Sequence, residues 1–123
     1  MYTIGLITTN HPKRFDVLLK TINSFDKEQT KGIKKILSVD KFPTIKTNFS
    51  FFKKIEEMGW SVIYKEHTGK NSMVTNQQNL LSFIETEWLL YCEDDVVLRD
   101  IPSVDTLKKM LTQETGFVSL NAH

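Results

Sequence analysis

The sequence is poor in cysteine: Cys92 is the only one among 123 residues, so no internal disulfide can form. Nothing else in the composition requires an oxidising compartment. No stretch approaches the ~20 apolar residues of a membrane span, and the amino-terminal run is too short for a signal peptide and lacks its basic lead-in. We therefore expect a cytoplasmic protein without an integral membrane segment, with Cys92 as a small buried core residue.

An excess of charge of either sign is also missing. Sixteen basic residues against fifteen acidic ones give a net charge of +1, which provides no electrostatic attraction for nucleic acid. Hydrophobic residues make up 40% and charged residues 25%, which is typical of a globular protein. The length lies within the usual range of ~100–200 residues for one domain, so residues 1–123 are predicted to form one.

Strand-like and helix-like patterns alternate along the chain. Apolar, β-rich runs predict strands at 2–8, 33–39, 60–64, 87–92 and 116–120. Helical spacing of apolar residues predicts helices at 15–25, 49–58, 73–84 and 101–111, and Gly59 is expected to stop the second of them. This alternation predicts an α/β fold: an open, mostly parallel sheet of about five strands with helices on both faces. Ligands of such sheets bind beyond the carboxyl ends of the strands.

The acidic run Glu93-Asp94-Asp95 stands at the end of the predicted strand 87–92. Adjacent carboxylates repel one another, and a cation relieves that cost. Their hard oxygen ligands suit magnesium or manganese. Alternation along an extended chain points Glu93 and Asp95 to one side and Asp94 to the other, so Glu93 and Asp95 are the candidate metal ligands. The alternative is a solvated acidic turn whose aspartates cap the following segment.

Polar residues also follow the first two predicted strands. Asp40 comes after an apolar strand, where a carboxylate can accept hydrogen bonds from a nucleobase or ribose; the alternative is a simple turn former. Thr8, Thr9 and Asn10 end the first strand, and a helix with Arg14 follows, an arrangement that can hold a base or a phosphate. The alternative is helix capping by Asn10 with a surface Arg14. Neither glycine-rich nucleotide motif, G-x-G-x-x-G or the P-loop, is present.

A last candidate segment begins at Gly69 and carries Lys70, followed by four consecutive amide side chains at 76–79. Lys70 can meet a phosphate. Consecutive amides add little to helix stability, so some of them, such as Asn76 and Asn79, are candidates for ligand contact. The alternative is a solvated first turn of a helix.

Together these features resemble the GT-A glycosyltransferases, the nucleotide-diphospho-sugar transferase superfamily. The resemblance covers nearly the whole chain, but only the N-terminal half of that fold. The opening strand and helix, Val39-Asp40, the segment from Gly69 to Asn79, and Glu87 through Asp95 carry it. At the D-x-D motif position this chain reads Glu93-Asp94-Asp95, so the first acid is a glutamate. The usual Arg-Asn pair is replaced by amides at 76–79.

The resemblance implies binding of a UDP- or GDP-sugar and transfer of the sugar to an acceptor glycan, lipid or protein. It implies that Glu93 and Asp95 hold manganese or magnesium and that Asp94 lies against the substrate. It further implies base contacts from Thr8, Thr9, Asn10 and Asp40. The acceptor-binding half and a catalytic base are expected to be missing.

Two other classes of function stay open: a donor-binding or truncated domain without catalysis, and a plain α/β interaction module. A phospho-acceptor signalling domain is disfavoured, because its acidic pair would follow the first strand, where this chain has Thr8, Thr9 and Asn10. A sheet that ends at Leu120 with an exposed edge would favour a homo-oligomer.

Overall fold

The fold is described by a computed structural model that covers residues 2–25, 28 and 30–95. The predicted helix at 101–111 and the predicted strand at 116–120 lie outside these residues, and so does the sheet edge expected at Leu120. Within the described part the strands are β1 (Tyr2–Thr9), β2 (Lys34–Lys41), β3 (Ser61–Glu66) and β4 (Trp88–Glu93). The helices are α1 (Phe15–Asn23), α2 (Phe49–Glu57) and α3 (Ser72–Ser82), with short 3-10 turns η1 (Pro12–Arg14) and η2 (Gly69–Asn71).

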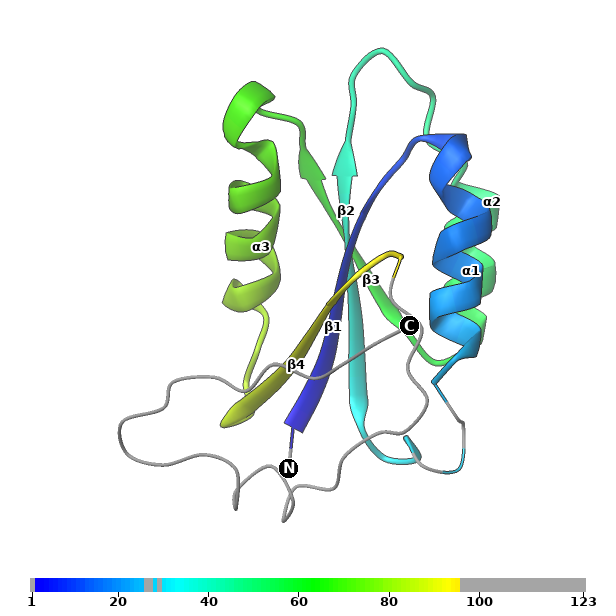
Figure 1. The fold of residues 1–123 in the computed structure, drawn as a ribbon, viewed down its shortest axis with the longest axis vertical. Helices are drawn as coiled ribbons and strands as arrows, with labels where there is room; N and C mark the ends of the chain where they lie inside the picture. The colour runs from blue at the N-terminus through cyan, green and yellow to red at the C-terminus, as the bar shows by residue number, and fades with distance from the viewer. Residues whose placement is uncertain (1, 26–27, 29, 96–123) are drawn as a thin grey trace.

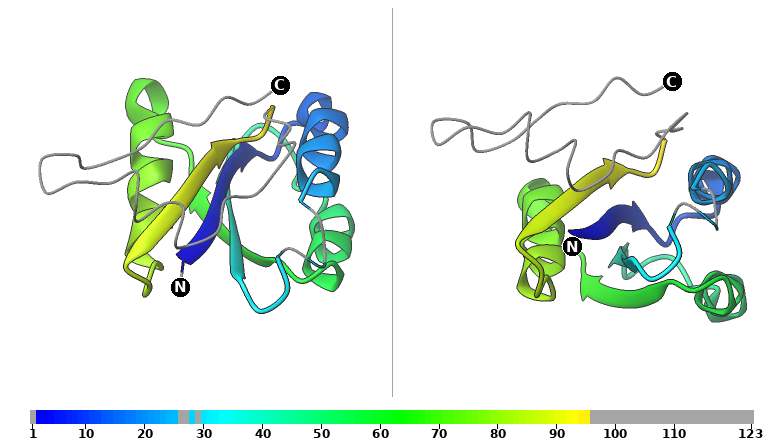
Figure 2. Two further views of the ribbon diagram at one scale, coloured as in Figure 1. Left: turned by 60° about the horizontal axis from the view of Figure 1, so that its bottom comes forward. Right: turned by 90° about the horizontal axis from the view of Figure 1, so that it is seen from below.

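The four described strands form one parallel sheet in the order β3-β2-β1-β4 (Figure 1). Helices α1 and α2 lie on one face of the sheet, and α3 lies on the opposite face (Figure 2). The chain moves outward from β1 to β3 and then returns to the far side of β1, so the topological switch point lies between β1 and β4. The predicted parallel α/β sheet with helices on both faces is confirmed. No helix in the described part is long and apolar enough to cross a membrane.

The larger core lies between the sheet and the pair α1 and α2. The apolar spacing of the first predicted helix is confirmed, because Leu18, Ile22 and Phe25 are all buried there. Phe52 of α2 is fully buried as well, and its ring meets Phe15 edge to face at 5.8 Å between centroids. Helix α2 ends at Glu57, just before the predicted stop at Gly59, whose φ of +100° suits a residue without a Cβ.

Helix α3 buries a different face from the one its apolar residues suggest. Met73 and Leu81, two of the residues whose spacing predicted this helix, are 51% and 55% exposed. Its buried residues are Ser72, Asn76 and Leu80. The difference arises because Ser72 and Asn76 form hydrogen bonds to Asp40 and Ser38 of β2, respectively. A pattern of apolar residues does not predict such bonds.

Gly5, in the middle of β1, allows α3 to pack close to the sheet. A Cβ added there would lie 2.8 Å from a Cδ of Leu80 and 2.9 Å from a Cδ of Leu89. Both distances are far inside ordinary van der Waals contact, so one of these leucines would have to move.

We predict that Gly5→Ala lowers the free energy of unfolding by about 1–2 kcal/mol through this overpacking. Urea denaturation measures this loss in the free energy of unfolding. Leu80→Val is the matched second change, because it shortens the side chain that collides with the new methyl group. The double variant should lose clearly less stability than the sum of the two single losses; strictly additive losses would contradict the close approach.

Candidate functional site

A cleft of about 440 Å³ opens at the carboxyl ends of the strands, over the switch point between β1 and β4. This is the location that the general rule for open α/β sheets assigns to ligands. Most of the candidates chosen from the sequence line it: Thr8, Thr9, Arg14, Asp40, Lys70, Asn76, Glu93 and Asp94. Asn10, Asn79 and Asp95 do not. Its wall also includes Phe42, His67, Ser72 and Met73, none of which was chosen from the sequence as a site residue.

Asp94 is the inward member of the acidic run and is 6% exposed. Arg14 donates two hydrogen bonds to its carboxylate, and Thr8 Oγ1 donates a third to Oδ2 at 2.8 Å. Thr21 Oγ1 of α1 donates to the backbone oxygen of Asp94 at 2.7 Å. The hydrogen bond to Asp94, followed by its charge, raises the pKa of Arg14 above its already high ordinary value. The charge of Asp94 is thus balanced within the chain.

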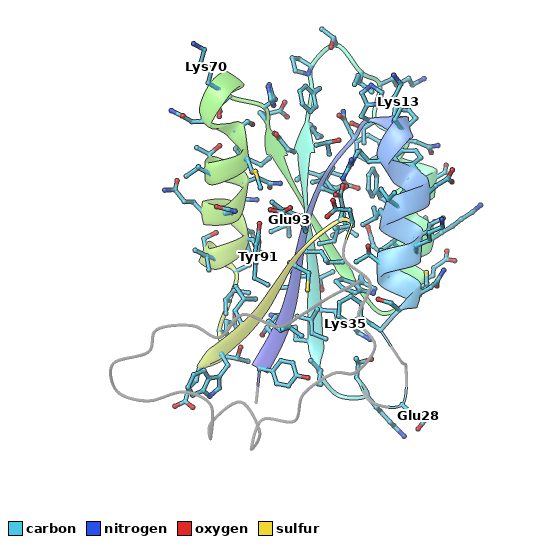
Figure 3. All side chains as sticks on the ribbon, in the orientation of Figure 1. Lys13, Glu28, Lys35, Lys70, Tyr91 and Glu93 are labelled. Atoms are coloured by element: carbon cyan, nitrogen blue, oxygen red, sulfur yellow. The ribbon has the colours of Figure 1, made fainter. Side chains whose placement is uncertain are left out.

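Glu93 and Asp95 are exposed on the other side, as the alternation predicted (Figure 3 labels Glu93 at the end of β4). Within residues 2–25, 28 and 30–95, no group of three or more His, Cys, Asp or Glu side chains is placed to hold a metal ion. These residues therefore do not form a metal site of three or more such protein ligands. Of the two carboxylates, Glu93 lines the cleft and Asp95 does not. Magnesium and manganese that are held jointly with substrate phosphates often take only one or two protein carboxylates.

Asp40, at the end of β2, is 4% exposed and bonded on both oxygens. Ser72 Oγ donates to Oδ2 at 2.7 Å, and His67 Nδ1 lies 3.0 Å from the same oxygen. Lys65 Nζ lies 3.5 Å from Oδ1. The carboxylate that the sequence suggested for base or ribose contact is thus largely occupied by side chains from β3 and from the segment that follows it.

The amide side chains of α3 hold the helix to the sheet. Asn76 is 2% exposed; its Oδ1 accepts from Ser38 Oγ at 2.6 Å, and its Nδ2 donates to the backbone oxygens of Thr8 and Ser38, each at 3.3 Å. Asn79 Nδ2 donates to the same Ser38 hydroxyl at 3.3 Å. Asn76 therefore forms part of the cleft wall with both amide hydrogens already engaged.

Asn10, just after β1, is fully buried and organises the loop after β2. Its Nδ2 lies 3.2 Å from Phe42 O, 3.1 Å from Ile45 O and 3.0 Å from Thr47 Oγ1, and its Oδ1 accepts from Phe42 N at 3.0 Å. The helical turn that follows is capped by His11, whose Nδ1 accepts from Lys13 N. Asn10 is thus a loop anchor rather than a helix cap.

The remaining candidates are more open to solvent. Thr9 is half-buried, and its Oγ1 accepts from the backbone of His11 at 3.2 Å. Lys70 is exposed in η2, just before α3, and makes no ion pair with any described residue (Figure 3). An exposed, unpaired ammonium at the rim of a cleft is available to an anionic ligand.

Neither His67 nor Ser72 was among the site residues chosen from the sequence. A useful signal was available, however: His67 directly follows β3, the strand beside β2. The carboxyl ends of parallel neighbours lie at one edge of the sheet, so the rule that selected Asp40 applies to His67 equally.

No known protein-family model matches the chain, and no curated protein matches it significantly. The geometry of the cleft is therefore the basis for assigning a function.

We predict that Asp94→Ala lowers the free energy of unfolding by about 2 kcal/mol, because it leaves Arg14 and Thr8 without their shared acceptor. Asp95→Ala is the matched control: its side chain is exposed, so a change below about 0.5 kcal/mol is expected. Chemical denaturation of both variants measures the difference. Equal losses would contradict the inward placement of Asp94.

Cys92, between Tyr91 and Glu93 on β4, is 5% exposed, and burial raises the pKa of its thiol to about 11. The expected buried core cysteine is confirmed. Because the thiolate is the reactive form, we predict that at about pH 8 the folded protein reacts with a disulfide reagent at least about a hundredfold more slowly than free cysteine. Denaturant should restore full labelling. Fast labelling of the folded chain would mean that β4 opens readily.

Proposed function

We propose that this chain binds a nucleoside diphosphate sugar, as the donor-binding part of a GT-A-type glycosyltransferase. One observation supports this most: the cleft at the switch point joins an exposed carboxylate, Glu93, to the polar ends of β1 and β2. Nucleotides bind at this place in open α/β sheets. The parallel order β3-β2-β1-β4 matches the beginning of the classic nucleotide-binding order.

In this proposal the acidic run divides into two functions. Asp94 is neutralised by Arg14 and keeps the end of β4 in place. Glu93 and Asp95 hold a divalent cation, magnesium or manganese, together with the diphosphate of the donor. When bound, that cation offsets the charge on the departing nucleoside diphosphate. Lys70, exposed at the rim, contributes a further positive charge toward the phosphates.

The nucleoside then lies over the ends of β1 and β2. Thr8 and Thr9 present backbone and hydroxyl groups there, and Phe42 and Met73 supply apolar surface for a base. Asp40 belongs to the same wall and keeps His67 and Ser72 in position. The acceptor and the catalytic base are not assigned to any described residue.

A second candidate function is an interaction module, and one observation favours it. Large apolar side chains are exposed on α3 and just after it: Met73, Val74, Leu81 and Phe83. A protein partner or a second copy of the chain would cover such a surface.

Calorimetric titration with UDP, GDP and their sugars, with and without manganese, distinguishes the two functions. We expect manganese to increase the affinity for the nucleotide. We expect Asp95→Ala to reduce this increase at least about tenfold and to leave the affinity without metal unchanged. Glu57→Ala, an exposed acid on α2, is the matched control and should bind as the wild type does. Absence of nucleotide binding under every condition would overturn the proposal and favour the interaction module.

A further inference from the structure

Asp40 has little capacity left for a ligand. An ionised carboxylate offers about four acceptor positions, and Ser72, His67 and Lys65 already occupy three of them. The side chain is only 6% exposed. Although Asp40 lines the cleft, a ligand there has more access to the residues that Asp40 holds than to its carboxylate.

His67 is the most strongly oriented of these residues. Its Nδ1 lies 3.0 Å from Asp40 Oδ2, and its ring stacks on Phe42 with 3.9 Å between centroids and 26° between planes. The ring lines the cleft and stays 23% exposed at its side chain. Within the described part of the chain, no residue hydrogen-bonds Nε2. One nitrogen is thus fixed on the protein while the other is left for a ligand.

The hydrogen on the His67 ring has a defined position. An ionised carboxylate only accepts hydrogen bonds, so Nδ1 must carry the hydrogen in the contact with Asp40. Lys65 and Ser72 also donate to this carboxylate. All three neighbours of Asp40 are therefore donors, and Asp40 is the acceptor in each contact. In the neutral ring Nε2 is then a pure acceptor.

We propose that His67 Nε2 reads the nucleobase of the donor, accepting a hydrogen bond from a ring N–H, with Asp40 as the residue that positions it. This inference rests on the proposed function. Uracil and guanine carry a hydrogen on the ring nitrogen of their pairing edge, whereas cytosine and adenine carry a lone pair there. His67 therefore selects uridine and guanosine diphosphates and disfavours the cytidine and adenosine counterparts, whose lone pair would face its own.

The selectivity follows from the cost of leaving an acceptor unpaired. A wrong base loses one hydrogen bond and opposes two lone pairs in a partly buried site, which corresponds to about a tenfold loss of affinity. Contacts to the diphosphate are the same for all four nucleotides. The ratio of affinities between bases thus isolates the base subsite from the phosphate subsite.

The test measures affinities of UDP, GDP, CDP and ADP by calorimetry with magnesium at about pH 8, where an ordinary imidazole is neutral. The wild type should bind UDP or GDP about tenfold more tightly than CDP and ADP. His67→Asn keeps an amide N–H where Nδ1 lies, so it retains the bond to Asp40 but removes the Nε2 acceptor. We expect it to fold, to bind all four nucleotides, and to lose most of the preference.

His11→Asn is the matched control, because His11, like His67, follows the carboxyl end of a strand, in its case β1, but is not part of the cleft wall. It should leave the preference unchanged. Nitrogen-15 shifts of the His67 ring give a second readout, which does not depend on affinity: the hydrogen should reside on Nδ1 in the free protein. Asp40→Asn should weaken that tautomer and lower the preference along with it.

The outcomes separate two failures. If the wild type binds none of the nucleotides, the proposed function fails, and the base-reading assignment falls with it. If nucleotides bind but His67→Asn keeps the full preference, only the assignment to His67 is overturned. The same holds if the wild type shows no preference for uracil or guanine, or if the ring hydrogen resides on Nε2.

Discussion

The ion pair between Asp94 and Arg14 determines what the end of β4 can offer to a ligand. Three adjacent carboxylates would repel one another at the edge of a core, and the bonds from Arg14 and Thr8 to Asp94 compensate the charge of one of them. The bond from Thr21 to the Asp94 backbone ties the same turn to α1. Glu93 and Asp95, on either side of it in the sequence, are exposed to solvent.

A second polar layer lies under the cleft, on the α3 side of the sheet. Asn76 joins α3 to the backbones of β1 and β2 at once, and Ser38 on β2 completes that set of bonds. Gly5 leaves room for Leu80 just beyond it. The hydrogen bonds of Asn76 near the cleft and the packing of Leu80 against Gly5 therefore hold α3 in place. Ser72, the first residue of α3, then donates a hydrogen bond to Asp40.

Periodicity was enough to predict the sheet class, the buried stripe of Leu18 and Ile22, and that Glu93 and Asp94 point to opposite sides, because each depends on residues close in sequence. The partners of Asn76 were out of reach, since Thr8 lies 68 positions away and the bond exists only once β1 and α3 meet. The position of His67 just after β3 could have placed it at the cleft, but its bond to Asp40 was out of reach for the same reason, because nothing near His67 in sequence shows that Asp40 will hold its ring. Tertiary hydrogen bonds, rather than local propensity, decide these roles.

Asn10 has a consequence for the cost of ligand binding. Four side-chain contacts join it to the loop after β2, from Phe42 through Ile45 to Thr47. The conformational entropy of that loop is lost when the chain folds, at about 1–2 kcal/mol for each ordered residue. Because Phe42 belongs both to this loop and to the cleft, its aromatic surface is already immobilised when a ligand arrives. Association then loses less entropy than it would at a free loop, and more of the contact energy appears as affinity.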